Sequence, residues 1–263
     1  MNMLKKGGTV VLPSIVAILL SLIIWELAVK IWGIEMWILP APSSIIQTFI
    51  QSMHTYPEHI WMTTIEAVLG FLLGITVALI LAFFLDWSPL LRKSIYPILL
   101  FSQTIPIIAI APLLIIWFGY GLLPKVLVVA LVTFFPVVVN VIEGLQSSDK
   151  DMIRLVRSMG GTQWQIFTNV RFPSALPYLF TGLRIGVTYS VLAAVISEWV
   201  GASKGLGIYL VKAQSAFATD KVFVIIALIS LLSCLLFLVV LLISRLAMPW
   251  KYKQYKKRSS RDE

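Results

Sequence analysis

Six long apolar segments follow one another along the chain, separated by shorter polar stretches. Each is long enough to cross a bilayer as a helix, which takes about 20 predominantly apolar residues. They lie near residues 9–32, 60–85, 94–118, 125–145, 175–198 and 222–247. The pattern predicts an all-α polytopic membrane protein with six transmembrane helices. We expect an N-terminal segment of residues 1–8, a transmembrane domain of residues 9–247, and a basic tail of residues 248–263.

The longest polar interruption, residues 146–174, separates the fourth and fifth apolar segments. Within it, apolar side chains recur at helical spacing and predict a short amphipathic helix. Its apolar face comprises Met152, Leu155, Val156 and Met159, and its polar face comprises Arg154, Arg157 and Ser158. Gly160 and Gly161 are expected to end this helix. Thr162 and Gln165 have the spacing of a capping box, which predicts a second helix start.

Prolines interrupt the third segment at residues 97, 106 and 112, and the fourth at residue 136. Proline bends a membrane helix and leaves a backbone carbonyl without its usual donor. Polar residues beside such breaks, or in mid-span, are candidates for a translocation pathway. They are Ser102, Gln103, Thr104, Asn140, Tyr189 and Ser190, with Glu198 at the end of the fifth segment. Hydrogen bonds between helices are the alternative role for these residues, and for Glu198 a place facing the external loop.

Composition agrees with a membrane protein, because 59% of the residues are hydrophobic and only 13% are charged. The net charge of +9 does not indicate nucleic-acid binding, since the chain has no soluble basic domain. Positive-inside topology and attraction to anionic membrane lipid account for it. With the N-terminus in the cytoplasm, most Lys and Arg residues fall in cytoplasmic segments. We therefore expect both termini, and residues 146–174, on the cytoplasmic side.

The sequence contains no Walker A, HExxH or CxxC pattern, so these motifs for nucleotide binding, metalloprotease and thiol chemistry are absent. With one cysteine, Cys234, neither an intrachain disulfide nor a cysteine metal site is expected. His54, Glu58 and His59 cluster, and we expect them to be solvated loop residues and not a metal site. The chain is therefore expected to have no nucleotide site and no cofactor of its own, and any energy it uses comes from a partner or an ion gradient.

Residues 154–173 resemble the cytoplasmic coupling loop of binding-protein-dependent ABC importer permeases. That loop has the pattern Glu-Ala-Ala, three residues, Gly, nine residues, Ile-x-Leu-Pro. Gly160 lies at the glycine, and Val170, Phe172 and Pro173 lie at Ile, Leu and Pro with the spacing intact. Arg154, Leu155 and Val156 occupy the Glu-Ala-Ala positions, so a base replaces the acidic residue. Residues 38–45, 104–121, 134–140 and 198–207 resemble the sulfonate, taurine, nitrate and thiamine-precursor branch of the same family.

This resemblance implies the type I (MetI-like) permease fold in the plasma membrane of a bacterium. It implies a non-catalytic homodimer that works with a cytoplasmic ATPase, which binds ATP and Mg²⁺, and an external solute-binding protein. The coupling residues it implies are Arg154, Leu155, Val156, Met159, Gly160, Gly161, Val170, Phe172 and Pro173. The substrate it favours is a hydroxymethylpyrimidine-type precursor of thiamine. Alkanesulfonates, taurine, nitrate and riboflavin are alternatives.

Two other classes of function were weighed against this one. A secondary transporter driven by an ion gradient predicts an internal repeat and acidic residues near mid-bilayer, and neither is clear in the sequence. An integral membrane enzyme needs a catalytic cluster near one interface, and His54, Glu58 and His59 are the only such group.

Overall fold

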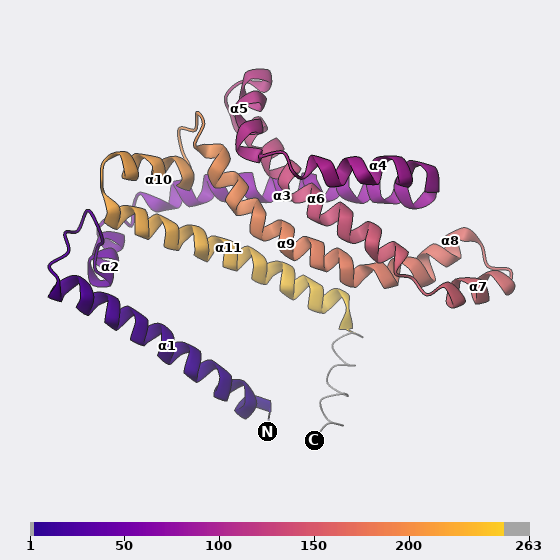
Figure 1. Cartoon of the computed structure of the whole chain (residues 1–263), viewed down its shortest axis with the longest axis horizontal. Coiled ribbons are helices and arrows are strands. Elements are labelled where there is room, and N and C mark those ends of the chain that lie inside the picture. The colour runs from indigo at the N-terminus through magenta and orange to yellow at the C-terminus, as the bar shows by residue number, and fades with distance from the viewer. Residues whose placement is uncertain (1–2, 250–263) are drawn as a thin grey trace.

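The computed structural model describes residues 3–249, and every regular element in that range is a helix (Figure 1). Side chains are described from residue 13, so Lys5, Lys6 and the basic tail lie outside the described side chains. The helices are α1 (Met3–Ile31), α2 (Pro42–Gln51), α3 (Tyr56–Trp87), α4 (Pro89–Ser102), α5 (Ile107–Phe118), α6 (Leu122–Gln146), α7 (Lys150–Ser158), α8 (Gln163–Ile166), the π-helical turn η1 (Phe167–Arg171), α9 (Phe172–Glu198), α10 (Leu206–Ser215) and α11 (Thr219–Ala247).

In the part of the chain that the structure describes, five helical stretches are long and apolar enough to cross a membrane, and a sixth span arises if α4 and α5 count as one. Five of the predicted segments are thus confirmed as helices. The third was expected to be one bent helix, which is wrong, because α4 and α5 meet at 99° across a break. Pro106, which lacks an N–H, is the N-cap immediately before α5, and the side chains of Ser102 and Thr104 bond the carbonyls of Leu99 and Phe101.

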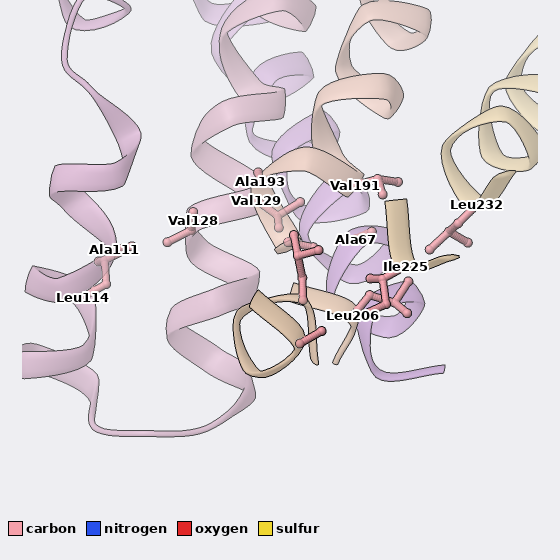
Figure 2. Packing of buried hydrophobic residues seen from close by; sticks show 13 residues of the cluster. Ala67, Ala111, Leu114, Val128, Val129, Val191, Ala193, Leu206, Ile225 and Leu232 are labelled. Carbon is pink, nitrogen blue, oxygen red and sulfur yellow. The ribbon is translucent and has the colours of Figure 1, made fainter. Parts of the chain in front are cut away.

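Helix α6 is the centre of the bundle, because it packs along α3 on one side and α9 on the other. Gly70 and Gly74 of α3 lie against α6: a Cβ at Gly70 would strike Val129, and one at Gly74 would strike Thr133. Small residues thus let α3 and α6 approach closely. Figure 2 shows buried apolar side chains of α5, α6, α9, α10 and α11 in one cluster with Ala67 of α3.

The bundle has two ends of different construction, at the left and right of Figure 1. One end carries α2, α10 and residues 199–205, and we call it the α10 end. The other carries α7, α8 and the turn between α3 and α4, and we call it the α7 end. Helix α1 lies at the side and packs mainly on α2, where Ser43 donates to Glu26 at 2.7 Å and Lys30 pairs with Glu26.

Candidate coupling segment and translocation cavity

Helix α7 is an amphipathic helix whose apolar face is largely uncovered within the described chain. Asp149 caps its start by accepting from the N–H groups of Asp151 and Met152. Leu155 is 53% exposed and Met159 is 79% exposed. Its main contact is with α8, and it has no buried residue. A helix with an apolar face that its own chain leaves uncovered is suited to docking on another protein.

The break after α7 has the predicted chemistry. Gly160 adopts a φ of +81°, a left-handed conformation that glycine adopts without the strain of a side chain. Gly161 lies against Val156, where a Cβ would clash. The capping box is confirmed: Thr162 N donates to Gln165 Oε1 at 2.7 Å, and Gln165 N donates to Thr162 Oγ1 at 3.3 Å. The segment therefore reverses direction through bonds of its own.

After the Gly160–Gly161 break, the segment returns to the bundle and is anchored there. Val170 is buried, whereas Phe172 at the start of α9 is largely exposed. Val170 lies within η1, a π-helical turn, and such turns are frequent at functional sites. Arg171 Nη1 donates to Asp86 Oδ2 at 2.8 Å, which ties η1 to the end of α3. The element that carries Val170, Phe172 and Pro173 is thus fixed to the spans, and α7 projects from it.

A cavity of about 470 Å³ lies beside the α4–α5 break, between α5, α6 and α9. Its wall is mostly apolar. The lining residues are Ser102, Gln103, Ile105, Ile107, Ile110, Leu131, Val132, Phe135, Pro136, Ile185 and Tyr189. Three of the predicted pathway residues therefore meet in one cavity: Ser102, Gln103 and Tyr189. A mostly apolar wall with a few polar groups is typical of small-molecule sites.

The other four predicted pathway residues do not line this cavity. Thr104 is exposed at the break and bonds the carbonyl of Phe101. Asn140 donates to the Pro136 carbonyl at 2.7 Å, and Ser190 is buried and donates to Val187. Glu198 is buried at the α10 end. The bonds of Thr104, Asn140 and Ser190 lie within their own segments, so none of the three joins two helices.

A buried group of charged side chains at the α10 end was missed by the sequence reasoning. Lys125 of α6 donates to Glu66 of α3 at 2.6 Å, and the two side chains are 8% and 0% exposed. Glu198, also 0% exposed, accepts from Thr63 Oγ1 at 2.6 Å and from the N–H of Gly207. Glu66, Lys125 and Glu198 fall near the same ends of their spans, which was the available signal.

Residues 204–207 are held against α3 by a set of contacts that we call the α10 clasp. His59 Nδ1 lies 3.0 Å from Gly205 N, and Leu206 N donates to Thr63 Oγ1 at 2.9 Å. Glu58 pairs with Lys204. The expectation that His59 is a solvated loop residue is wrong, because α3 begins at Tyr56 and the imidazole stacks on Tyr209 at 4.7 Å. Within residues 3–249 no group of His, Cys, Asp and Glu is arranged to hold a metal ion.

Comparison with known proteins decides the family. Residues 70–248, more than half of the chain, match the family described as "Binding-protein-dependent transport system inner membrane component". The chain belongs to this family. The chain is 34% identical over 252 residues to the formylaminopyrimidine transport permease protein ThiX of Halalkalibacterium halodurans, covering 95% of this chain and 100% of that protein.

Two further relatives differ in the substrate that their names give. The riboflavin transport system permease protein RibX of Chloroflexus aurantiacus is 35% identical, covering 90% of this chain and 89% of its own length. The taurine transport system permease protein TauC of Escherichia coli is 28% identical over the same shares of the two chains, 90% and 89%. The substrates of relatives this similar are thus chemically diverse.

Solved structures agree with the fold. An inward-facing structure of the MetNI methionine ABC transporter aligns with a TM-score of 0.65 at 21% identity, covering 74% of this chain and 97% of that chain. The chain is therefore a multi-pass membrane permease subunit of an ABC importer with the MetI-like fold. Such subunits are non-catalytic, and the family implies an ATPase and a substrate-binding protein as partners. A gradient-driven transporter and a membrane enzyme are both set aside.

Proposed function

We propose that this permease imports a pyrimidine precursor of thiamine. The observation that carries the proposal is the match to the formylaminopyrimidine permease, which runs over that protein's whole length. The cavity at the α4–α5 break supports it, because apolar walls with the polar groups of Ser102, Gln103 and Tyr189 suit a flat, neutral heterocycle. Alkanesulfonate and taurine carry a fixed negative charge, and no basic side chain lines this cavity.

The test is uptake by proteoliposomes that contain the permease, its ATPase and the solute-binding protein encoded beside it. We expect ATP-dependent uptake of a labelled aminopyrimidine, with little uptake of riboflavin, taurine, nitrate or an alkanesulfonate. Uptake of riboflavin in preference to the pyrimidine would reassign the substrate within the same family. The variant Tyr189→Ala is expected to lower uptake more than Thr188→Ala, because Tyr189 lines the cavity and Thr188 does not.

We infer that the α7 end faces the cytoplasm and that α7 docks in a cleft of the ATPase. The α7 end carries Arg92, Lys93, Arg154, Arg157 and Arg171, as the positive-inside rule requires. Both termini then lie in the cytoplasm and α10 lies outside. The docking contacts are assigned to the apolar face of α7 and to the Gly160–Gly161 turn. In the proposed homodimer, one ATPase binds each copy of the chain. The cavities of the two copies then lie along one translocation route.

Replacing Gly160 tests the docking role. Leucine at a φ of +81° is strained, so Gly160→Leu should reorient α7 relative to α8. We expect ATPase stimulation by the loaded solute-binding protein and uptake to fall by about tenfold or more, with the permease still in the membrane. Gly33 also has a positive φ, and Gly33→Leu at the α10 end is the matched control. Normal stimulation in Gly160→Leu would remove the docking role.

A further inference from the structure

Four aromatic rings form a continuous wall at the α7 end. Trp87 packs on Phe83 at 6.2 Å, Phe83 meets Phe167 edge-on at 5.9 Å, and Phe167 stacks on Trp164 at 5.7 Å. The two indoles at the ends of the wall are 76% and 63% exposed. Tryptophan is enriched where a protein meets the boundary between lipid headgroups and acyl chains. This wall, which we call the aromatic wall, joins the end of α3 to α8 and η1.

The aromatic wall borders a cavity of about 480 Å³ that also contains two arginines and one carboxylate. Arg171 donates to both oxygens of Asp86, at 3.0 and 2.8 Å, and its Nε is buried without a hydrogen-bond acceptor among the described residues. The guanidinium of Arg157 makes no hydrogen bond or ion pair within residues 3–249. The cavity thus has one positive charge in excess, beside an unused donor.

A second cavity, of about 210 Å³, lies against the same two rings. It shares Phe83 and Phe167 with the first cavity and its lining is entirely apolar. Its other lining residues are Leu79, Val141, Leu145, Phe172, Ala175, Leu176 and Leu179. The pair of cavities is therefore amphipathic, with a cationic compartment next to a hydrocarbon compartment.

We propose that these two cavities bind one anionic phospholipid, with its phosphate between Arg157 and Arg171 and an acyl chain against the apolar compartment. The excess positive charge matches one phosphodiester, and Arg157 and the Nε of Arg171 supply donors. The apolar compartment distinguishes a lipid from a soluble phosphate, which has nothing to place there. The choice of the cytoplasmic leaflet rests on the proposed placement of the α7 end. The bound lipid fixes the base from which α7 projects.

The experiment uses the purified permease, alone and with its ATPase, in detergent. Native mass spectrometry counts retained phosphatidylglycerol, and titration measures its affinity against phosphatidylcholine and against soluble glycerophosphoglycerol. We expect phosphatidylglycerol to bind in preference to both. Arg157→Gln should weaken its binding roughly fivefold, the effect of one basic side chain at a lipid surface. Arg154→Gln, on the same helix but outside the cavity, is the matched control and should leave binding unchanged.

Three outcomes would overturn the lipid site. Equal losses in Arg157→Gln and Arg154→Gln would show a diffuse attraction to the cationic surface. Equal binding of glycerophosphoglycerol would show a soluble phosphate site. Retention by the permease alone, with loss on adding the ATPase, would show that the partner covers the cavity. These readouts do not depend on uptake, so a complex that imports pyrimidine without retaining phosphatidylglycerol contradicts the lipid site only.

Discussion

The two ends of the bundle use polar and apolar side chains in opposite ways. At the α10 end, Glu66, Lys125 and Glu198 are buried. Lys125 of α6 pairs with Glu66 of α3, and Glu198 of α9 accepts hydrogen bonds from α3 and from the α10 clasp. At the α7 end, α7 has no buried residue, and Met152, Leu155 and Met159 of its apolar face are exposed. Buried charges are stabilised only by their partners, whereas an exposed apolar face is stabilised by a surface that covers it.

The difference teaches which end depends on another protein for its structure. The polar contacts of the α10 end are made within the chain, across α3, α6, α9 and the start of α10. The α7 end holds its own turn by the Gly160 conformation and the capping box, but leaves the apolar face of α7 free. Substitutions at the α10 end should therefore change the stability of the isolated permease. Substitutions on α7 should act on its association with the ATPase.

The largest effect is expected from Lys125→Met, which removes the single positive charge beside two buried carboxyl groups. Breaking a buried ion pair from one side typically costs about 3–5 kcal/mol, because the remaining charge is left without a partner. We expect a marked fall in the melting temperature of the purified permease in detergent. Lys212→Met, at an exposed position of α10, is the control and should leave the melting temperature nearly unchanged.

A double variant separates the charge from the packing. Lys125→Met with Glu66→Gln leaves no unpaired charge at that pair, so it should recover part of the melting temperature lost in Lys125→Met. If Lys125→Met has the same melting temperature as the unchanged protein, the ion pair at 2.6 Å does not determine stability. The α10 end would then not be stabilised by its own polar contacts.

A smaller loss of stability is expected from Gly205→Ala. Gly205 has a φ of +132°, and a Cβ there would strike the carboxylate of Glu198. The methyl group should push residues 204–207 away from α3 and break the bonds to His59 and Thr63. We expect a lower melting temperature of the permease and faster amide hydrogen exchange in α10. Gly119→Ala, also at a positive φ but with open space around it, tests whether backbone strain alone explains the loss.

Most of the α7 end could be predicted from the sequence, because the residues that determine its structure lie close together along the chain. The apolar spacing of Met152 to Met159, the Gly160 break and the Thr162–Gln165 box each depend on residues within one or two turns of one another. The structure adds the ties that are distant in sequence, such as Arg171 to Asp86. The single-helix prediction for residues 94–118 failed because it treated Pro106 as a bend and not as a helix start.

The α10 end lay beyond sequence reasoning, because most of the contacts that hold α3, α6, α9 and the α10 clasp together there join residues that are 59 to 146 positions apart. Glu66, Lys125 and Glu198 are each ambiguous alone, and only the packing of α3 and α9 on α6 brings them together. The pathway candidates divide for the same reason: Ser102, Gln103 and Tyr189 share a cavity, while Ser190 bonds its own helix.

At the α7 end, Leu155→Asp is expected to leave the melting temperature of the isolated permease unchanged, because Leu155 is exposed there. Its affinity for the ATPase should fall by about tenfold or more, as for an apolar residue at the centre of an interface. Surface plasmon resonance with the immobilised permease measures this. Ser158→Asp adds the same charge three residues later, on the polar side of the helix, and is the control. A fall in melting temperature without loss of affinity would reverse the comparison between the two ends.

The smallest effect is expected from Arg154→Glu, at the position where the related coupling loops carry an acidic residue. Arg154 Nη1 lies 3.2 Å from Asp151 Oδ1, and both side chains are largely exposed, so the pair contributes little to the fold. If Arg154 faces a carboxylate on the ATPase, charge reversal should slow association a few-fold, and added salt should diminish the difference. The dissociation rate should change less, because the apolar face of α7 remains intact. An unchanged association rate at low salt would leave Arg154 as a solvated partner of Asp151 and assign docking to the apolar face alone.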